Sequence, residues 1–178
     1  MRVSSVEVTP VSAHGPAAWA CLERYFEELA ARFPEGFDWC SDGGVELDDY
    51  LPPAGVFLVA QILGEPAGCG ALRTFSPGVG EIKRMWVDSA ARGLGVGARI
   101  LAELERHAAG FGVRTLRLET NRSLQEAQAL YRRSGYAEVK AFNDEPYAHH
   151  WFEKALQRPR QRSGAAPARK SRRAVRPG

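Results

Sequence analysis

The chain has 178 residues, of which 44% are hydrophobic and 25% are charged, and these proportions fit one globular domain with a sizeable core. No stretch of about eighteen apolar residues occurs, and the N-terminus MRVSSVEVTP lacks the apolar core of a signal peptide, so we expect a cytoplasmic protein with no membrane partner. The chain has three cysteines, Cys21, Cys40 and Cys69. Their odd number disfavours a disulfide framework, and their spacing is not that of metal ligands.

Positive charge is concentrated at the C-terminus. Residues 158–178 hold eight basic residues and no acid, whereas residues 1–157 hold 16 basic and 21 acidic residues. The final segment is rich in Pro, Gly, Ala and Arg and has few large apolar side chains to offset the entropy lost on ordering. We therefore predict a domain over residues 1–157 and a disordered tail over residues 158–178. The tail either solubilises the protein or contacts nucleic acid or another polyanion, and we expect no other contact with nucleic acid.

Hydrophobic periodicity and turn residues predict the elements in chain order. A first strand over residues 3–8 ends at Pro10, and Pro16 opens an amphipathic helix over residues 17–33. A short helix is expected near residues 46–51, followed by a hairpin of strands 55–63 and 67–75 that are joined by Gly64, Glu65 and Pro66. The next elements are a strand over 81–87, a helix over 94–109 and a strand over 113–119. The domain ends with a helix over 123–134 capped by Gly135 and with strands over 136–139 and 149–156. In the strand over 81–87, strict alternation puts Glu81, Lys83, Met85 and Val87 on one face and Ile82, Arg84 and Trp86 on the other.

The least regular part of the domain is rich in acids and aromatics. Residues 35–50 contain six acids and no base (Glu35, Asp38, Asp42, Glu46, Asp48 and Asp49), together with the aromatics Phe37, Trp39 and Tyr50. Carboxylates around a cleft attract cations, and aromatic faces add cation–π attraction. The segment is equally compatible with a solvated loop.

A glycine-rich stretch, VDSAARGLGVGARIL, joins the strand over 81–87 to the helix over 94–109. Arg92, Gly95 and Gly97 stand in the order R-x-x-G-x-G, with Gly93 between them. The free N–H groups and partial positive charge of a helix N-terminus favour phosphate binding. The pattern is neither a Walker A loop nor a G-x-G-x-x-G dinucleotide motif.

Two segments in this order, EIKRMWVDSAARGLGVG and ALYRRSGY at residues 129–136, resemble the GNAT acetyltransferase superfamily. The resemblance implies an α/β (α+β) fold with a mixed, mostly antiparallel sheet of six to seven strands and about four flanking helices. It further implies that the fourth and fifth strands splay apart after a bulge in the fourth, and that acetyl-CoA binds in the opening.

Carried over residue by residue, the resemblance implies a cofactor site. The pantetheine would hydrogen-bond to the backbone of Met85, Trp86 and Val87. The pyrophosphate would lie on the backbone amides of the loop and the first helical turn (Gly93, Leu94, Gly95, Val96, Gly97 and Ala98). Arg92 would close over it. Relatives often carry an Asn where this chain has Leu124. Asn121, at the end of a strand, is either a compensating cofactor contact or a turn former.

The resemblance also implies the catalytic groups. Tyr131 matches the family tyrosine that donates a proton or hydrogen bond to the departing thiolate. Glu81 stands where many relatives keep the base that accepts the amine proton, with Glu119 as the competing candidate. His149 and His150 point to opposite faces of their strand, so at most one of them lines the acceptor site.

The predicted function is therefore N-acetyl transfer from acetyl-CoA to a primary amine by direct attack in a ternary complex. The acidic segment favours a small cationic or amino-acid-like acceptor. Two alternatives remain open, namely a lysine or N-terminal amine of a protein as the acceptor, and an acyl-CoA sensor without turnover. The oligomeric state is open as well, with a homodimer as one option.

Overall fold

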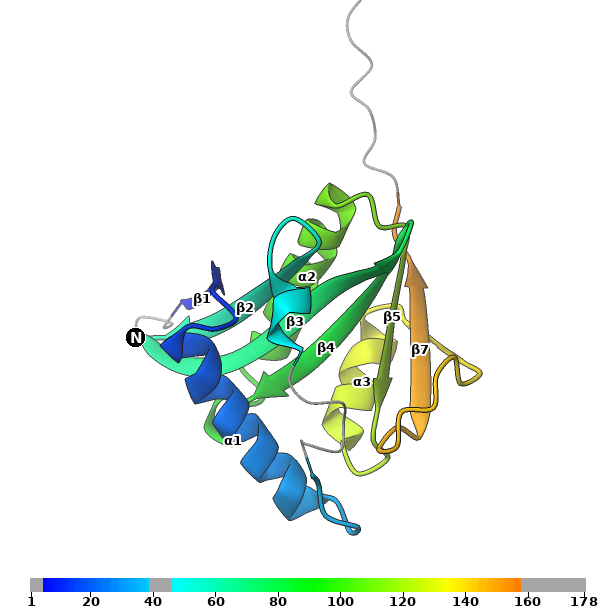
Figure 1. The fold of residues 1–178 in the computed structure, drawn as a ribbon. Helices are drawn as coiled ribbons and strands as arrows, with labels where there is room; N and C mark the ends of the chain where they lie inside the picture. The colour runs from blue at the N-terminus through cyan, green and yellow to red at the C-terminus, as the bar shows by residue number, and fades with distance from the viewer. Residues whose placement is uncertain (1–4, 39–45, 158–178) are drawn as a thin grey trace, which may run out of the picture.

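The computed structural model describes residues 5–38 and 46–157, which form seven strands and three α-helices (Figure 1). Trp39, Cys40, Asp42 and the predicted tail over 158–178 lie outside the described residues. The strands are β1 (Val6–Val11), β2 (Gly55–Ile62), β3 (Glu65–Ser76), β4 (Val79–Val87), β5 (Thr115–Thr120), β6 (Ala137–Val139) and β7 (His150–Ala155), and the helices are α1 (Pro16–Arg32), α2 (Val96–Gly110) and α3 (Gln125–Arg133). The short helix expected near residues 46–51 is the 3-10 turn η1 (Leu47–Tyr50), and a second 3-10 turn, η2 (Ser89–Ala91), follows β4.

All seven strands form one mixed sheet in the order β1-β2-β3-β4-β5-β7-β6. Neighbouring strands are antiparallel except β4 and β5, which are parallel and pair only where Val79, Gly80 and Glu81 meet Thr115, Leu116 and Arg117. Beyond Glu81 the two strands diverge, as Figure 1 shows. The predicted splay between the fourth and fifth strands is confirmed, and it leaves the β5-facing backbone edge of β4 unpaired with β5.

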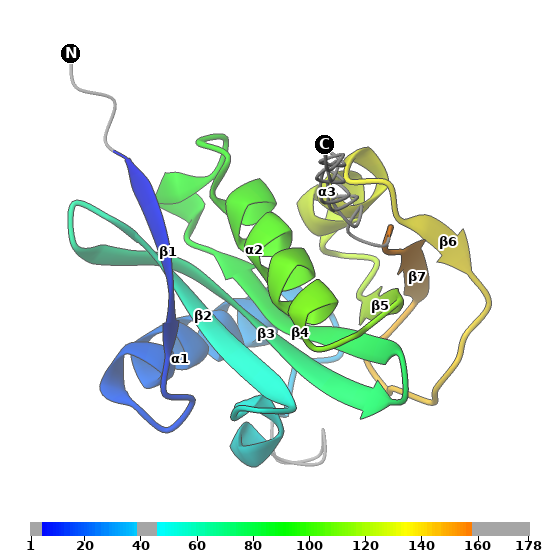
Figure 2. The ribbon, with the colours of Figure 1, turned by 90° about the horizontal axis from the view of Figure 1, so that it is seen from above.

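The sheet separates two layers of core. Helix α1 covers one face, and α2 and α3 cover the other (Figure 2). On the α1 side, Cys21 and Leu22 pack with Phe57 and Trp86, all of which are buried. On the other side, the core contains buried residues of α2, α3 and the strands (Ile100, Leu101, Leu104, Tyr131, Leu116 and Phe152). The amphipathic pattern of residues 17–33 thus predicts correctly that this helix packs on a sheet.

The first strand runs further than predicted. It continues through Pro10 to Val11, with Pro10 opposite Leu58 of β2. Because β1 is the edge strand of the sheet, the missing N–H of a proline can face away from the only neighbouring strand. The prediction that Pro10 ends the strand is therefore wrong.

A bulge in β4 changes which side chains share a face. Cys69 pairs with Trp86 and Ala71 pairs with Lys83, so β4 has one more residue than β3 between these pairs. Arg84 lies in the bulge with a φ of 56°. Ile82 consequently belongs to the α2-side core with Met85 and Val87, whereas Trp86 belongs to the α1-side core. The prediction of strict alternation from Glu81 to Val87 is wrong because an extra residue inverts the alternation beyond the bulge.

The β2–β3 turn is also tighter than predicted. Leu63 and Gly64 form it with φ values of 54° and 84°, and Glu65 and Pro66 already belong to β3. Two consecutive residues with positive φ are typical of the two-residue hairpin turn that matches the twist of the strands.

Candidate functional site

The predicted phosphate loop opens α2 in the expected geometry. Gly95 is the N-cap of α2 in a left-handed conformation, with φ of 78°, and no side chain caps the helix. Gly93 also has a positive φ, of 79°, a conformation that favours glycine. The N–H groups of the first helical turn therefore have no side-chain acceptor and can bind an anion.

A groove of about 320 Å³ leads from this loop along the end of β4, between α1 and α3. Most residues of the predicted cofactor set line it, as a strand segment, a loop and the first turn of α2 (Met85, Trp86, Val87, Arg92, Gly93, Gly95, Val96, Gly97 and Ala98). Leu94 differs, because its side chain is 60% exposed and does not line the groove. Leu130 and Ala127 of α3 form the opposite wall.

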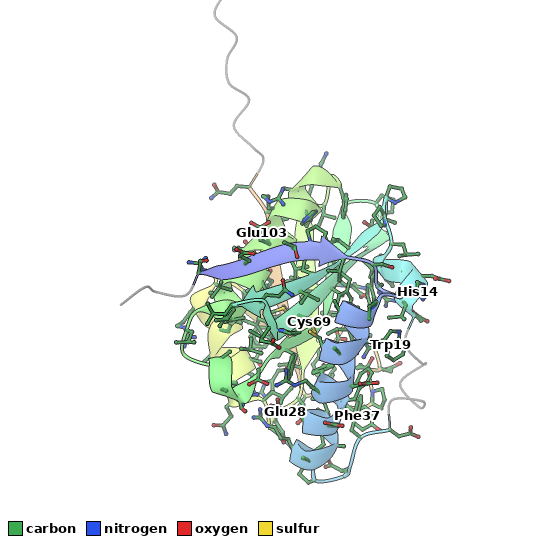
Figure 3. All side chains as sticks on the ribbon, turned by 90° about the vertical axis from the view of Figure 1, so that its left-hand side faces the viewer. His14, Trp19, Glu28, Phe37, Cys69 and Glu103 are labelled. Carbon is green, nitrogen blue, oxygen red and sulfur yellow. The ribbon has the colours of Figure 1, made fainter. Side chains whose placement is uncertain are left out.

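Ion pairs between α1, the loop and α3 adjoin this groove. Arg92 pairs with Glu28 of α1, and Arg32 of α1 pairs with Glu126 of α3. Glu28 also accepts a hydrogen bond of 2.9 Å from the indole of Trp86 and pairs with Arg32 at 2.8 Å. Figure 3 shows Glu28 in the C-terminal half of α1. The sequence gives no signal for these contacts, because their partners are up to 94 residues apart.

A second cavity, of about 230 Å³, lies next to the groove. Its walls come from the end of α1, the segment after it, η1, β3, β4, the end of β5, α3 and the β6–β7 loop. The cavity and the groove share a boundary of six residues (Tyr25, Leu29, Met85, Leu124, Ala127 and Tyr131). Two molecules bound in the two spaces would therefore meet beside Tyr131.

Tyr131 lies on α3 and is only 4% exposed. Its ring packs against Tyr136 and Phe152, with centroids 6.1 Å and 5.8 Å away. Burial raises the pKa of the Tyr131 phenol well above its usual range, and the charges of Tyr25 and Glu119 add to this effect. The phenol therefore stays protonated at neutral pH and can donate a hydrogen bond or a proton at the boundary of the two spaces.

The two candidate bases have different surroundings. Glu81 is 1% exposed and lines neither space. It accepts hydrogen bonds from Arg73 Nε at 2.8 Å and from Arg117 Nη2 at 2.7 Å. Burial alone would raise the pKa of Glu81, but the hydrogen bonds from Arg117 and Arg73 outweigh it, and the pKa lies below its ordinary value.

Glu119 lines the cavity, and its side chain is 6% exposed. One carboxylate oxygen pairs with Lys83, while Oε2 is buried and has no hydrogen-bond partner among the described residues. An unpartnered buried acceptor on a cavity wall is an unusual feature, because buried polar atoms are nearly always hydrogen-bonded.

The structure places the remaining predicted residues outside the groove. Asn121 lines the cavity instead, where its Nδ2 donates to the Tyr147 carbonyl at 2.8 Å and its Oδ1 accepts from the Ser123 N–H at 2.9 Å. These contacts are those of a turn former. His150 pairs with Glu138 at 2.6 Å, His149 is exposed, and neither histidine lines the cavity.

Four acids of residues 35–50 pair with residues of other elements. Glu35 pairs with Arg122 at 3.2 Å, and Asp48 bonds to His14 at 2.8 Å. Glu46 and Asp49 both pair with Arg73, at 2.9 Å and 2.7 Å. Of the segment's acids, Glu46 lines the cavity, Asp38 does not, and Asp42 lies outside the described residues. Sequence alone could not reveal these partners, because they come from other elements.

A groove that ends at an uncapped helix N-terminus adjoins a cavity at a buried tyrosine, an arrangement with room for two ligands side by side. The model of the acetyltransferase (GNAT) family matches residues 18–136. An IAA acetyltransferase of Azospirillum brasilense is 36% identical over 127 residues, which cover 71% of this chain and 77% of that protein. The chain therefore belongs to the GNAT family and is an acetyltransferase.

Solved structures share the fold. A Klebsiella pneumoniae protein assigned as an acyl-CoA N-acyltransferase is 30% identical, with a TM-score of 0.69 over 86% of this chain and 99% of its own. A GNAT acetyltransferase of Elizabethkingia anophelis, solved with acetyl-CoA bound, is 17% identical, with a TM-score of 0.57 over 85% of this chain and 98% of its own.

Among residues 5–38 and 46–157, no helix has the length and apolar character needed to cross a membrane. The same ranges contain no group of three or more His, Cys, Asp or Glu residues placed to hold a metal ion.

Proposed function

We propose that the protein transfers the acetyl group of acetyl-CoA to the primary amine of a small molecule, by direct attack in a ternary complex. The observation that carries this proposal is the boundary shared by groove and cavity, which brings a donor in one and an acceptor in the other together at Tyr131 and Met85. The cavity, at about 230 Å³, is smaller than the pockets of about 300–1,000 Å³ that hold drug-sized ligands, and it suits a small acceptor.

The groove residues fit acetyl-CoA. The uncapped first turn of α2 supplies N–H donors for a pyrophosphate, and the β4 edge beyond Glu81 supplies backbone groups for a pantetheine amide. Arg92 and Arg32 add positive charge beside the loop, although both are paired with carboxylates in this structure. A bound phosphate would compete with Glu28 and Glu126 for these guanidinium groups.

We assign the proton transfers to residues at the boundary and on the cavity wall. The Glu119 Oε2 accepts the proton that the amine must lose before attack, because this oxygen has no hydrogen-bond partner among the described residues and belongs to a residue that lines the cavity. The Tyr131 hydroxyl donates to the sulfur of the departing thiolate. Glu81 is the weaker candidate for the base, since two arginines occupy its oxygens and it lines neither space.

Acetyl-CoA-dependent thiol release, measured across small amines, amino acids, polyamines, aminoglycosides and basic peptides, tests this proposal. We expect turnover with small primary amines. Tyr131→Phe should lower kcat by about 10²-fold or more, with acetyl-CoA binding retained, because the general acid is lost while the groove keeps its shape. Turnover confined to peptides would instead indicate a protein acceptor. Silence across the panel with acetyl-CoA still bound would contradict the proposal and indicate a sensor.

A further inference from the structure

The charges in the acceptor cavity do not favour a polycation. Six charged residues line it, namely the acids Glu46, Glu119 and Glu145 and the bases Arg73, Lys83 and Arg84, so the formal charges of the lining cancel. Glu46 pairs with Arg73, and Glu119 pairs with Lys83. A polyamine or aminoglycoside would therefore meet no net negative charge in the cavity.

Three aromatic residues of the cavity lining pack against one another. Phe33 ends α1, Phe37 follows it, and Tyr147 comes from the β6–β7 loop. Their ring centroids lie 4.9 Å apart for Phe37 and Tyr147, 5.7 Å for Phe33 and Phe37, and 5.8 Å for Phe33 and Tyr147. We call these three residues the aromatic wall. Figure 3 shows Phe37 close to the lower end of α1.

The aromatic wall is held from two sides, so it is a built surface. The Asp38 backbone N–H donates to the Tyr147 hydroxyl at 3.0 Å, and the Tyr147 carbonyl accepts from Asn121 Nδ2 at 2.8 Å. Phe37 also stacks on Phe26, with centroids 5.8 Å apart. Phe37 and Tyr147 are both half-buried, and both line the cavity.

We propose that the acceptor is an arylalkylamine, a compound with one primary amine on a short chain that ends in an aromatic ring. This inference rests on the proposed function and names its substrate class. The amine lies at Glu119 and Tyr131, where the acetyl group arrives, and the ring joins the aromatic wall. Edge-to-face and offset contacts with Phe37 and Tyr147 select an aromatic ring over an aliphatic group of similar size.

The test compares amines that differ in one property at a time. With acetyl-CoA saturating, kcat/KM is measured for 2-phenylethylamine, 2-cyclohexylethylamine and 1,4-diaminobutane. We expect 2-phenylethylamine to exceed the cyclohexyl compound by about three- to tenfold, and the diamine by more. Preference for the diamine, or equal use of the ring compounds, would overturn the inference while leaving the proposed function intact.

A substitution in the aromatic wall tests whether this wall causes the preference for an aromatic amine. Phe37→Leu keeps an apolar side chain but removes the ring, so it should raise KM for 2-phenylethylamine about three- to tenfold, change KM for 1,4-diaminobutane much less, and leave KM for acetyl-CoA unchanged. Trp19→Leu is the matched control, because Trp19 is an aromatic of α1 that is 37% exposed and lines neither space. Equal losses with both amines would overturn the inference. No turnover with any amine, with acetyl-CoA still bound, would overturn the proposed function as well.

Discussion

At the scale of single residues, Glu81 joins three neighbouring strands. It lies on β4 opposite Arg73 of β3 and Arg117 of β5, and both arginines bond to its carboxylate. In Glu81→Gln the new amide N–H group would face an arginine, and a buried charge would lose its partner. We expect the free energy of unfolding to fall by about 3–5 kcal/mol, measured by chemical denaturation.

Glu119→Gln should mainly lower activity, whereas Glu81→Gln mainly lowers stability. Its amide oxygen still accepts from Lys83, and its N–H group occupies the place of Oε2, which faces no protein partner. We expect kcat to fall by about 10²-fold. The free energy of unfolding should fall less than in Glu81→Gln, because the change weakens one ion pair, with Lys83, and not two. A large loss of activity in a still-folded Glu81→Gln protein, with Glu119→Gln active, would reassign the base to Glu81.

The surroundings of Glu81 also predict a dependence of stability on pH. Because the two arginines hold its folded-state pKa below the ordinary value of 4.5, the carboxylate stabilises the fold above that pH. This contribution is lost as the pH falls through the folded-state pKa. Denaturation at a series of pH values should show a steeper loss in acid for the wild type than for Glu81→Gln, and parallel curves would contradict the assignment.

At the scale of elements, α2 packs closely on β3 at Gly70. A Cβ at this position would lie 2.8 Å from both Ile100 Cγ2 and Met85 Sδ. We expect Gly70→Ala to lower the free energy of unfolding by about 1–3 kcal/mol through overpacking. The matched control is Gly110→Ala at the end of α2, where a Cβ would meet nothing within 4 Å. The control should be neutral or gain up to about 1 kcal/mol, and equal effects of the two changes would exclude overpacking.

The same elements show how far sequence patterns reach. The bounds of α1, α2, α3 and the central strands follow from hydrophobic periodicity and capping residues, since these patterns depend on local geometry. The bulge at Arg84 does not follow from these patterns, because a non-glycine residue with φ of 56° leaves no local signal, and only the family resemblance implies a bulge in this strand. The extension of β1 through Pro10 depends on its place at the sheet edge, which only the assembled sheet defines.

At the scale of the whole molecule, the donor side of the site is more predictable than the acceptor side. The donor loop is one continuous stretch, so residues 92, 93 and 95–98 could be named from the sequence and all line the groove. The cavity is assembled from segments far apart in the chain, such as Phe37 and Tyr147. The packing of Phe37 against Tyr147, and the ion pairs of Glu46 and Asp49 with Arg73, arise only after folding.

The boundary shared by the groove and the cavity has a consequence for inhibition. A bisubstrate analogue, in which a short linker joins the coenzyme A sulfur to the acceptor nitrogen, would cross between them past Tyr131 and Met85 without a gap to bridge. Tethering makes the second binding event intramolecular, so the analogue should bind about 10²–10⁴-fold more tightly than either half alone. Calorimetric titration should find one analogue per chain, displaced by acetyl-CoA and by the amine alike.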